Sequence, residues 1–158
     1  MKYTFKQYGI KLFWLIANPP RTAYWFVVRP HTRGAKCLIE NNGAFLLVRL
    51  NYAHRLWTLP GGGVHKNESF EQAAIRESAE EAGILPSKVL KLGEYTTNHQ
   101  YKIDTVHVYY YQAPTREFSV DGFEIAEAGW FRPEELPANR SASVSRVIAM
   151  LPHPPKAF

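Results

Sequence analysis

Three glutamates within five residues, Glu77, Glu80 and Glu81, are spaced so that a helix would carry their carboxylates on one face. With about 100° of rotation per residue, the three side chains fall within an arc of roughly 100°. Carboxylates three and four residues apart destabilise a helix by roughly 0.2–0.5 kcal/mol per pair, and the macrodipole disfavours negative charge in the last turn. Helix formation alone therefore does not explain this cluster.

A divalent metal ion would explain it. Mg²⁺ takes oxygen ligands, is usually held by one or two carboxylates, and keeps waters that it shares with substrate phosphates. The other interpretation is an acidic, solvated helix face, which is the commoner meaning of an isolated Glu-x-x-Glu-Glu. The surrounding residues decide between the two.

The surrounding segment has a regular pattern of glycines and charged residues. In chain order its fixed positions are Gly62, Glu68, the run 76–81, Gly83 and the apolar Ile84. This 23-residue pattern resembles the Nudix box, and the lead-in Trp-Thr-Leu-Pro-Gly-Gly at 57–62 is also similar to that of the family. With residue frequencies of about 7% at seven fixed positions, a chance match is on the order of one in a million.

The resemblance extends from about residue 33 to about residue 136. It implies an α/β fold, an α/β/α sandwich with a mixed sheet. It also implies a hydrolase that cleaves a phosphoanhydride bond in a nucleoside diphosphate linked to another moiety, with Mg²⁺ or Mn²⁺ activating the attacking water. Ser78 stands where the family generally has an aliphatic residue, a departure that weakens one core contact and removes no ligand.

By position, the resemblance also implies residue roles. Glu77 and Glu81 would bind the metal directly, and the backbone carbonyl of Gly61 would be a further ligand. Glu80 would be another ligand or a partner of metal-bound water, which makes it a catalytic candidate. Four residues would have structural roles within the motif: Gly62, Glu68, Arg76 and Gly83. Arg76 and Glu68 would tie the loop to the helix and orient the carboxylates.

A general base for the attacking water is expected outside the helix. Many family members have an acidic residue a few positions before a Trp on a late strand. Glu124, six residues before Trp130, is the candidate here, and Glu127 is the alternative. Both also fit an ordinary acidic loop at 121–127.

Arg49 and Arg55 precede the glycine-rich segment and are candidates for binding substrate phosphates through bidentate hydrogen bonds. Surface arginines without such a role are common, so both interpretations stay open. The substrate itself is not specified. The stretch 98–101 lacks the proline of the family's ADP-ribose-cleaving branch, which disfavours that branch.

The central helix is expected from the N-cap Ser69 to Ala82, with Gly83 as C-cap. Asn42-Gly43 predicts a hairpin turn between the apolar runs 35–39 and 44–50. Three consecutive glycines at 61–63 predict a loop shaped for close backbone approach. Further elements are strands at 89–95, 105–112 and 128–131 with 96–104 as a connection, a turn or short helix at 132–137, and a closing helix at 142–151.

The chain's 158 residues, 46% of them hydrophobic, fit a single catalytic domain, expected over 29–151. An extra N-terminal helix at 3–17 would belong to an extension over 1–28, and 152–158 would form an extended tail. The single cysteine, Cys37, excludes an intramolecular disulfide and reads as a buried thiol. We therefore expect a cytoplasmic protein.

The net charge of +5 is concentrated in residues 1–39, which contain seven Lys or Arg and no acidic residue. This asymmetry suggests an anionic partner, such as phosphate, nucleic acid or lipid headgroups, and a solvated basic face is the alternative. For the segment 1–28, the alternatives are peripheral membrane contact, packing on the main domain, or a homodimer contact. A non-catalytic Nudix-fold module that binds nucleic acid or an anionic membrane is the competing function. Because the charged residues of the motif are all present, we favour the hydrolase, with RNA expected only as a 5′-phosphorylated substrate.

Overall fold

The computed structural model describes residues 29–51, 56–99, 101–120, 122 and 124–152. The predicted N-terminal extension over 1–28, with its helix at 3–17, lies outside the described residues, as do Arg55 and residues 153–158 of the predicted tail. Within the described part of the chain, no helix is long and apolar enough to cross a membrane.

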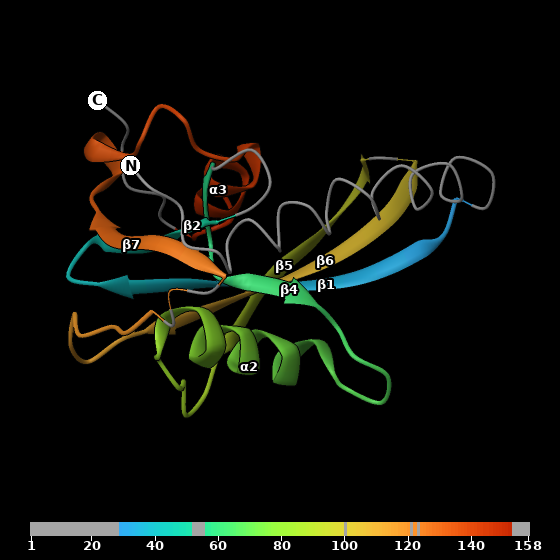
Figure 1. Ribbon diagram of the computed structural model, residues 1–158, viewed down its shortest axis with the longest axis horizontal. Coiled ribbons are helices and arrows are strands. Elements are labelled where there is room, and N and C mark those ends of the chain that lie inside the picture. The colour runs from blue at the N-terminus through green and yellow to red at the C-terminus, as the bar shows by residue number, and fades with distance from the viewer. Residues whose placement is uncertain (1–28, 52–55, 100, 121, 123, 153–158) are drawn as a thin grey trace, which may run out of the picture.

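A mixed seven-stranded sheet forms the centre of the described structure (Figure 1). Its strands are β1 (His31–Asn41), β2 (Ala44–Leu50), β3 (Trp57–Thr58), β4 (Gly61–Gly63), β5 (Leu90–His99), β6 (Lys102–Gln112) and β7 (Ile125–Phe131). The strand order is β3-β2-β1-β6-β5, with β4 paired to β1 and β7 paired to β2. The β1–β6 pair is parallel, and the other pairs are antiparallel.

The predicted hairpin is confirmed. Asn41 pairs with Ala44 across a two-residue turn. Asn42 and Gly43 both have positive φ, at 50° and 77°, as a type I′ turn requires. Asn and Gly are the residues that adopt this conformation at least cost, so the turn sets the register of β1 and β2.

Strand β1 divides one of its edges between two partners. Its first half pairs with β4, from Gly34 opposite Gly63 to Lys36 opposite Gly61, and its end pairs with β2. Its other edge pairs with β6 from His31 to Glu40. Residues far apart in the sequence therefore meet on the two sides of β1.

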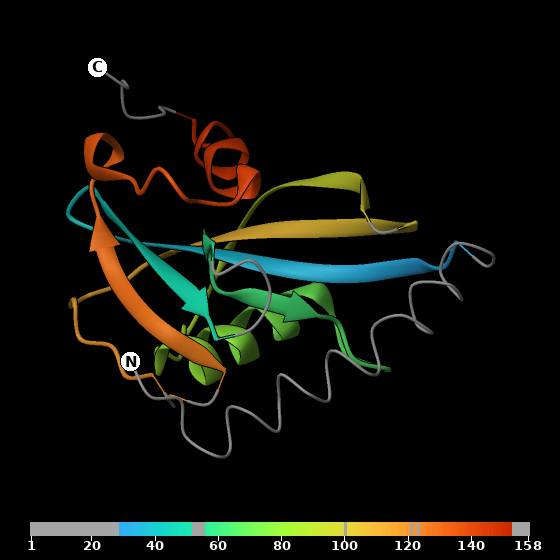
Figure 2. The same cartoon turned by 45° about the horizontal axis from the view of Figure 1, so that its top comes forward.

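Two helices cover opposite faces of the sheet, as Figures 1 and 2 show. Helix α2 (Phe70–Ala82) buries Ala73 and Ala74 in one apolar cluster, and α3 (Ala142–Ile148) buries Val144 and Val147 in the other. Full burial of a valine or leucine side chain contributes about 1.5–3 kcal/mol. The predicted α/β/α sandwich with a mixed sheet is confirmed.

The ends of α2 agree with the sequence prediction. The Ser69 side chain accepts from the backbone N–H of Gln72 (3.1 Å), and the Gln72 side chain accepts from the Ser69 N–H (2.9 Å), which completes a capping box. Gly83 has φ 64°, and its N–H donates to the carbonyl of Ala79. This left-handed residue ends the helix two positions after Glu81.

Other boundaries differ from the predictions. Strands β5 and β6 continue through the predicted connection at 96–104, because Thr96 to His99 pair with Lys102 to Thr105. The predicted glycine loop contains strand β4, because its backbone hydrogen-bonds along β1. Strand β7 begins at Ile125, three residues earlier than expected, and α3 ends at Ile148. The short helix predicted within 132–137 is a 3-10 turn, η1 (Pro133–Glu135).

Candidate metal and substrate site

Two carboxylates of α2 lie directly against the backbone of β4. The buried Glu81 accepts a hydrogen bond from the backbone N–H of Gly61 at 2.8 Å. A Cβ atom placed on Gly62 would collide with the carboxylate of Glu77, and one placed on Gly61 would collide with the carbonyl oxygen of Ala35. A side chain at either position would therefore displace a neighbour, which is the backbone of β1 at Gly61 and the carboxylate of Glu77 at Gly62.

Burial and mutual repulsion disfavour charge on these carboxylates. Burial is the main cause that raises the pKa of Glu81 to about 7, with repulsion from Glu77 and Glu124 adding to it. Burial also raises the pKa of Glu77, and Glu80 and Glu124 add to the effect. The N–H of Gly61 and the charges of Arg76 and Lys36 oppose these shifts only partly. A cation placed here would stabilise the charged forms.

Arg76 is the hydrogen-bond hub of the motif. Its guanidinium donates to Glu68 (2.8 and 3.1 Å), to Glu77 (2.8 Å), to Glu80 (2.9 Å) and to the carbonyl of Gly63 (2.9 Å). These bonds raise the pKa of Arg76 above its ordinary value. Because one rigid group holds the loop carbonyl and three carboxylates, it fixes the position of α2 relative to β4.

Glu68 is held on the loop side of this hub. It accepts both bonds from Arg76 and a third from the backbone N–H of His65 at 2.8 Å. The hydrogen bonds from Arg76, followed by the one from His65, lower the pKa of Glu68 to about 2. The geometry agrees with the structural role expected for Glu68 and Arg76.

Glu80 occupies a different position from its two neighbours. Its side chain is 59% exposed and pairs with Arg76 at 2.9 Å. Glu81, by contrast, is buried beneath β4. The predicted roles of Glu80 as ligand and catalytic group stay predictions, with its carboxylate on the solvent side of the cluster.

The two candidate bases separate clearly in space. Glu124 lies just before β7, and its charge raises the pKa values of Glu77 and Glu81, so it belongs to the acidic cluster. Its backbone carbonyl accepts from the N–H of Asn51 at 2.7 Å. Glu127 instead forms an ion pair with Arg49 at 2.7 Å. The structure brings Glu124, and not Glu127, to the carboxylates of α2.

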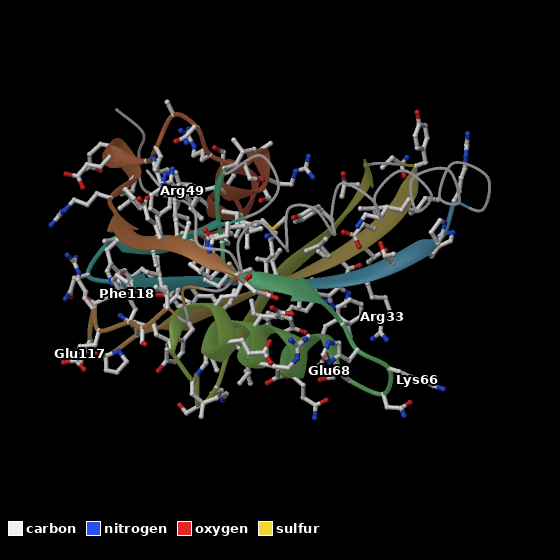
Figure 3. The ribbon with its side chains drawn as sticks, in the orientation of Figure 1. Arg33, Arg49, Lys66, Glu68, Glu117 and Phe118 are labelled. Carbon is white, nitrogen blue, oxygen red and sulfur yellow. The ribbon has the colours of Figure 1, made fainter. Side chains whose placement is uncertain are left out.

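Arg49 lies on the α3 side of the sheet (Figure 3). Its guanidinium pairs with Glu127 and lies over the ring of Trp57 at 5.6 Å, while its Nε atom is buried without a hydrogen-bond partner among the described residues. Its predicted contact with substrate phosphates stays a prediction. The same holds for Arg55, which lies outside the described residues.

The donor set fits a hard divalent ion. Among the described residues, no three His, Cys, Asp or Glu side chains converge into a complete metal site. Mg²⁺ does not need such a site, because it keeps several waters and takes phosphate oxygens from its substrate. Glu77, Glu81 and the carbonyl of Gly61 would supply oxygen ligands. A cation would relieve the unfavourable proximity of the buried Glu81 carboxylate and the partly buried Glu77 carboxylate.

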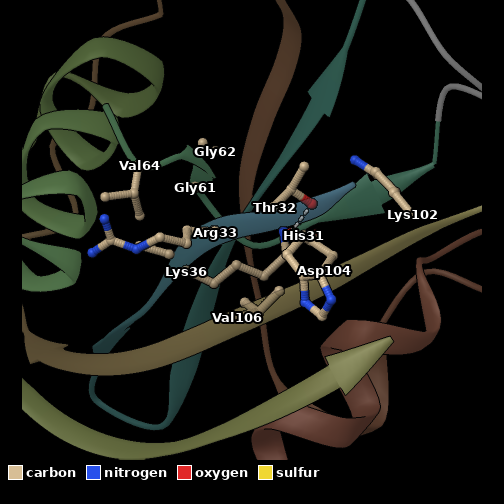
Figure 4. A pocket seen from close by; sticks show the side chains of 13 residues that line it. His31, Thr32, Arg33, Lys36, Gly61, Gly62, Val64, Lys102, Asp104 and Val106 are labelled. Atoms are coloured by element: carbon tan, nitrogen blue, oxygen red, sulfur yellow. Dashed lines mark hydrogen bonds between the residues drawn. The ribbon is translucent and has the colours of Figure 1, made fainter. Parts of the chain in front are cut away.

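A cleft of about 640 Å³ adjoins this cluster (Figure 4). Strands β4, β1 and β6 form its floor, with Gly61, Lys36 and Asp104 among the lining residues. Asp104 accepts a hydrogen bond from the hydroxyl of Thr32 at 2.8 Å. The cleft therefore brings polar side chains of β1 and β6 next to the glycines that contact Glu77 and Glu81.

Comparison with known proteins identifies the family. The family model described as the NUDIX domain matches residues 30–151. The chain belongs to the Nudix family. The match covers every site residue discussed above, including the Nudix motif at 62–84 and Glu124.

Two curated Nudix relatives resemble the chain at the sequence level. MutT4 of Mycobacterium tuberculosis is 36% identical over 111 residues, which cover 67% of this chain and 45% of MutT4. A protein of Escherichia coli named CTP pyrophosphohydrolase is 31% identical over 103 residues, which cover 62% of this chain and 73% of that protein. The chain thus spans less than half the length of one relative and most of the other. Such relatives support a hydrolase that acts on acid anhydrides.

A solved Nudix structure confirms the architecture. The crystal structure of the MutT Nudix hydrolase from Burkholderia pseudomallei is 25% identical, with a TM-score of 0.70. The alignment covers 77% of this chain and 98% of that structure. The mixed sheet between two helices is therefore the Nudix fold.

Sequence reasoning missed Lys36. It was hidden in the apolar run 35–39, which reads as an ordinary buried strand. The signal that could have revealed it is the single charge inside that run, because buried lysines are rare unless they are paired. Asp104 was missed because the segment 96–104 was expected to connect two strands.

Proposed function

We propose that the chain is a Mg²⁺-dependent nucleotide pyrophosphohydrolase, which cleaves a phosphoanhydride bond in a nucleoside diphosphate linked to another moiety. The observation that carries the proposal is the placement of Glu77 and Glu81 against the glycine backbone of β4. A buried carboxylate and a partly buried one that repel each other are unfavourable in a purely structural role and favourable beside a divalent cation.

Glu77, Glu81 and the Gly61 carbonyl would hold Mg²⁺. When bound, the ion would neutralise charge on the diphosphate and lower the pKa of water. Mn²⁺ has the same preference for oxygen ligands and would be expected to replace it.

The chain's own groups would then orient the reactants and accept a proton. Arg76 holds Glu77 and Glu80 in fixed positions through hydrogen bonds of 2.8 and 2.9 Å. Glu124, next to the acidic cluster, would accept the proton of the attacking water as general base, and Glu80 would orient that water from the solvent side. General-base catalysis of this kind contributes about 10²–10⁴-fold to the rate.

The relative named CTP pyrophosphohydrolase supports a nucleotide substrate and the cleavage of an acid anhydride. The cleft of about 640 Å³ beside Gly61 is within the usual size range for a small-molecule site and is large enough for the rest of such a substrate.

The test is turnover on a panel of nucleoside triphosphates, dinucleoside polyphosphates, nucleotide sugars and 5′-triphosphate RNA, with Mg²⁺ and with EDTA. We expect hydrolysis of at least one class, dependent on the metal, and a loss of at least about 10²-fold in Glu81→Gln and Glu77→Gln. Glu71→Gln is the matched control, because Glu71 lies on the same helix but is exposed in its first turn. Full activity in the double variant of Glu77 and Glu81 would exclude the metal assignment.

A further inference from the structure

Lys36 is a charged residue at the centre of the sheet. It lies on β1 opposite Gly61 of β4 and opposite Val108 of β6. Its neighbours in sequence, Ala35 and Cys37, are buried in the apolar cluster beneath α2. Because side chains alternate along a strand, Lys36 projects from the opposite face.

The ammonium of Lys36 is anchored to the segment that leads into β4. Its Nζ atom donates to the hydroxyl of Thr58 at 3.1 Å and to the carbonyl of Leu59 at 3.3 Å. An ammonium has three donor hydrogens. Within the described residues, these bonds use two of them.

Three carboxylates act electrostatically on this ammonium, two of them from the proposed metal site. Burial lowers the pKa of Lys36, while Glu81, Asp104 and Glu77 act in the opposite direction and favour its charged form. Lys36 is therefore electrostatically connected to both proposed carboxylate ligands. It is also connected to Asp104 on the far side of the cleft floor.

Lys36 also lines the cleft. Figure 4 shows it on the floor strand between the glycines of β4 and Asp104 of β6. A group bound in the cleft beside Gly61 would therefore meet the ammonium on the face of β1 away from α2. Packing alone does not require a charge at this position, because methionine has a similar length and no desolvation cost.

The geometry points to Lys36 as a substrate-binding residue, whose ammonium binds a non-bridging phosphate oxygen of the substrate at the inner end of the cleft. This inference rests on the proposed function. Two carboxylates offset the two charges of Mg²⁺, so a diphosphate with two or more negative charges still needs a cation. Lys36 supplies one, and Thr58 and Leu59 fix its direction.

The primary experiment measures binding of inorganic pyrophosphate in the presence of MgCl₂ by isothermal titration calorimetry. Lys36→Met, which keeps the length and removes the charge, should weaken pyrophosphate binding by about 10-fold or more, since hydrogen bonds to charged groups are among the stronger ones. Binding of Mg²⁺ alone should stay equal or become tighter, because a repelling charge is removed. Lys36→Gln removes the charge but keeps a donor, and it serves as the second variant if methionine disturbs folding.

Thr58→Val is the matched control, because it removes one anchor of Lys36 and leaves the charge. It should weaken pyrophosphate binding by no more than a few-fold. Equal pyrophosphate affinity in the wild type and in both charge-removing variants would overturn the inference. So would a parallel loss of affinity for Mg²⁺ alone, which would mean that Lys36 only shapes the metal loop.

Kinetics separate this inference from the proposed function. If the wild type hydrolyses a nucleotide and Lys36→Met leaves KM and pyrophosphate affinity unchanged, the role of Lys36 is wrong and the function stands. If the wild type hydrolyses nothing on the panel but binds pyrophosphate through Lys36, the function is wrong and the anion site stands. If both are right, Lys36→Met raises KM more than it lowers kcat.

Discussion

The backbone N–H of Gly61 donates to the carboxylate of Glu81 across 2.8 Å, which joins a strand of three glycines to the last turn of α2. The bond orients one oxygen of a buried acid, and the adjacent Gly62 leaves space for the carboxylate of Glu77. The segment predicted as a loop shaped for close backbone approach is thus a strand that forms one wall of the proposed metal site. The first two predictions follow from this contact.

Glu81→Gln should stabilise the metal-free protein at alkaline pH. With the pKa of Glu81 raised to about 7, the folded state holds its proton more tightly than the unfolded state, whose pKa is near 4.5. The contribution of Glu81 to the unfolding free energy is therefore highest below about pH 4.5, and it falls as the pH rises toward 7. In EDTA at pH 8 we expect a gain of about 1–3 kcal/mol from the substitution, measured by urea unfolding. Added Mg²⁺ should stabilise the wild type and the control Glu71→Gln, but not Glu81→Gln.

Gly61→Ala and Gly62→Ala should have different effects. A Cβ on Gly61, which has φ 146°, would meet the backbone of Ala35 and Lys36, so this variant should lose about 2–4 kcal/mol of stability. A Cβ on Gly62 would meet only the carboxylate end of the Glu77 side chain, which can shift at the cost of its hydrogen bond from Arg76. We therefore expect a stable protein, within about 1 kcal/mol of the wild type, with strongly weakened Mg²⁺ binding. Thermal unfolding and metal titration on the same two samples test the contrast, and equal loss of stability in both would contradict it.

Glu68→Gln should change how the unfolding free energy depends on pH below about pH 5. The hydrogen bonds from Arg76 and His65 lower the pKa of Glu68 to about 2. The contribution of Glu68 to the unfolding free energy is therefore present above about pH 4.5, the pKa of this group in the unfolded chain, and it is lost as the pH falls toward 2. The difference in unfolding free energy between wild type and variant should shrink between pH 5 and pH 2. A constant difference across this range would show that the hydrogen bonds, and not the charge, stabilise the loop.

Glu124→Gln and Glu127→Gln should separate catalysis from stability. If Glu124 is the general base, its variant should lose about 10²–10⁴-fold in kcat and the acidic limb of its pH profile, with little change in thermal stability. Glu127→Gln removes the partner of Arg49 and should chiefly lower stability. Steady-state kinetics from pH 5 to 9 and thermal unfolding are the measurements. The reverse pattern would assign the base to Glu127.

The elements that could be predicted are those with local signals. Helix α2 has a capping box at Ser69 and a left-handed glycine at its end, so its bounds were found to within one residue. The Asn42-Gly43 turn fixes its own hairpin for the same reason. Glu77 and Glu81 follow from the helical period, and their proximity to the backbone of β4 follows from the glycines before them.

The remaining features depend on contacts between distant residues. Three glycines form β4 only because β1 offers them a paired edge. The choice between Glu124 and Glu127 depends on the register of β7 against β2, which shifts between Arg49 and Leu50. A role for Lys36 becomes evident only in the folded structure, where its ammonium contacts Thr58 and Leu59 and the residue lines the cleft. No local sequence pattern predicts these tertiary contacts.

Strand β1 pairs with β4 and β2 along one edge, and this pairing determines which contacts must break before the proposed metal site can open. Because β1 pairs with β6 along its other edge, the glycine wall is fixed to a strand in the interior of the sheet. Release of this wall breaks the pairing of β4 with β1 and the hydrogen bond from Gly61 to Glu81, so amide hydrogen exchange at Cys37, which donates to Pro60 just before β4, should be slow. The site therefore opens only when both of these contacts are lost. Because it needs strands some 70 residues apart, it also forms only when the slow, long-range pairing of the fold is complete.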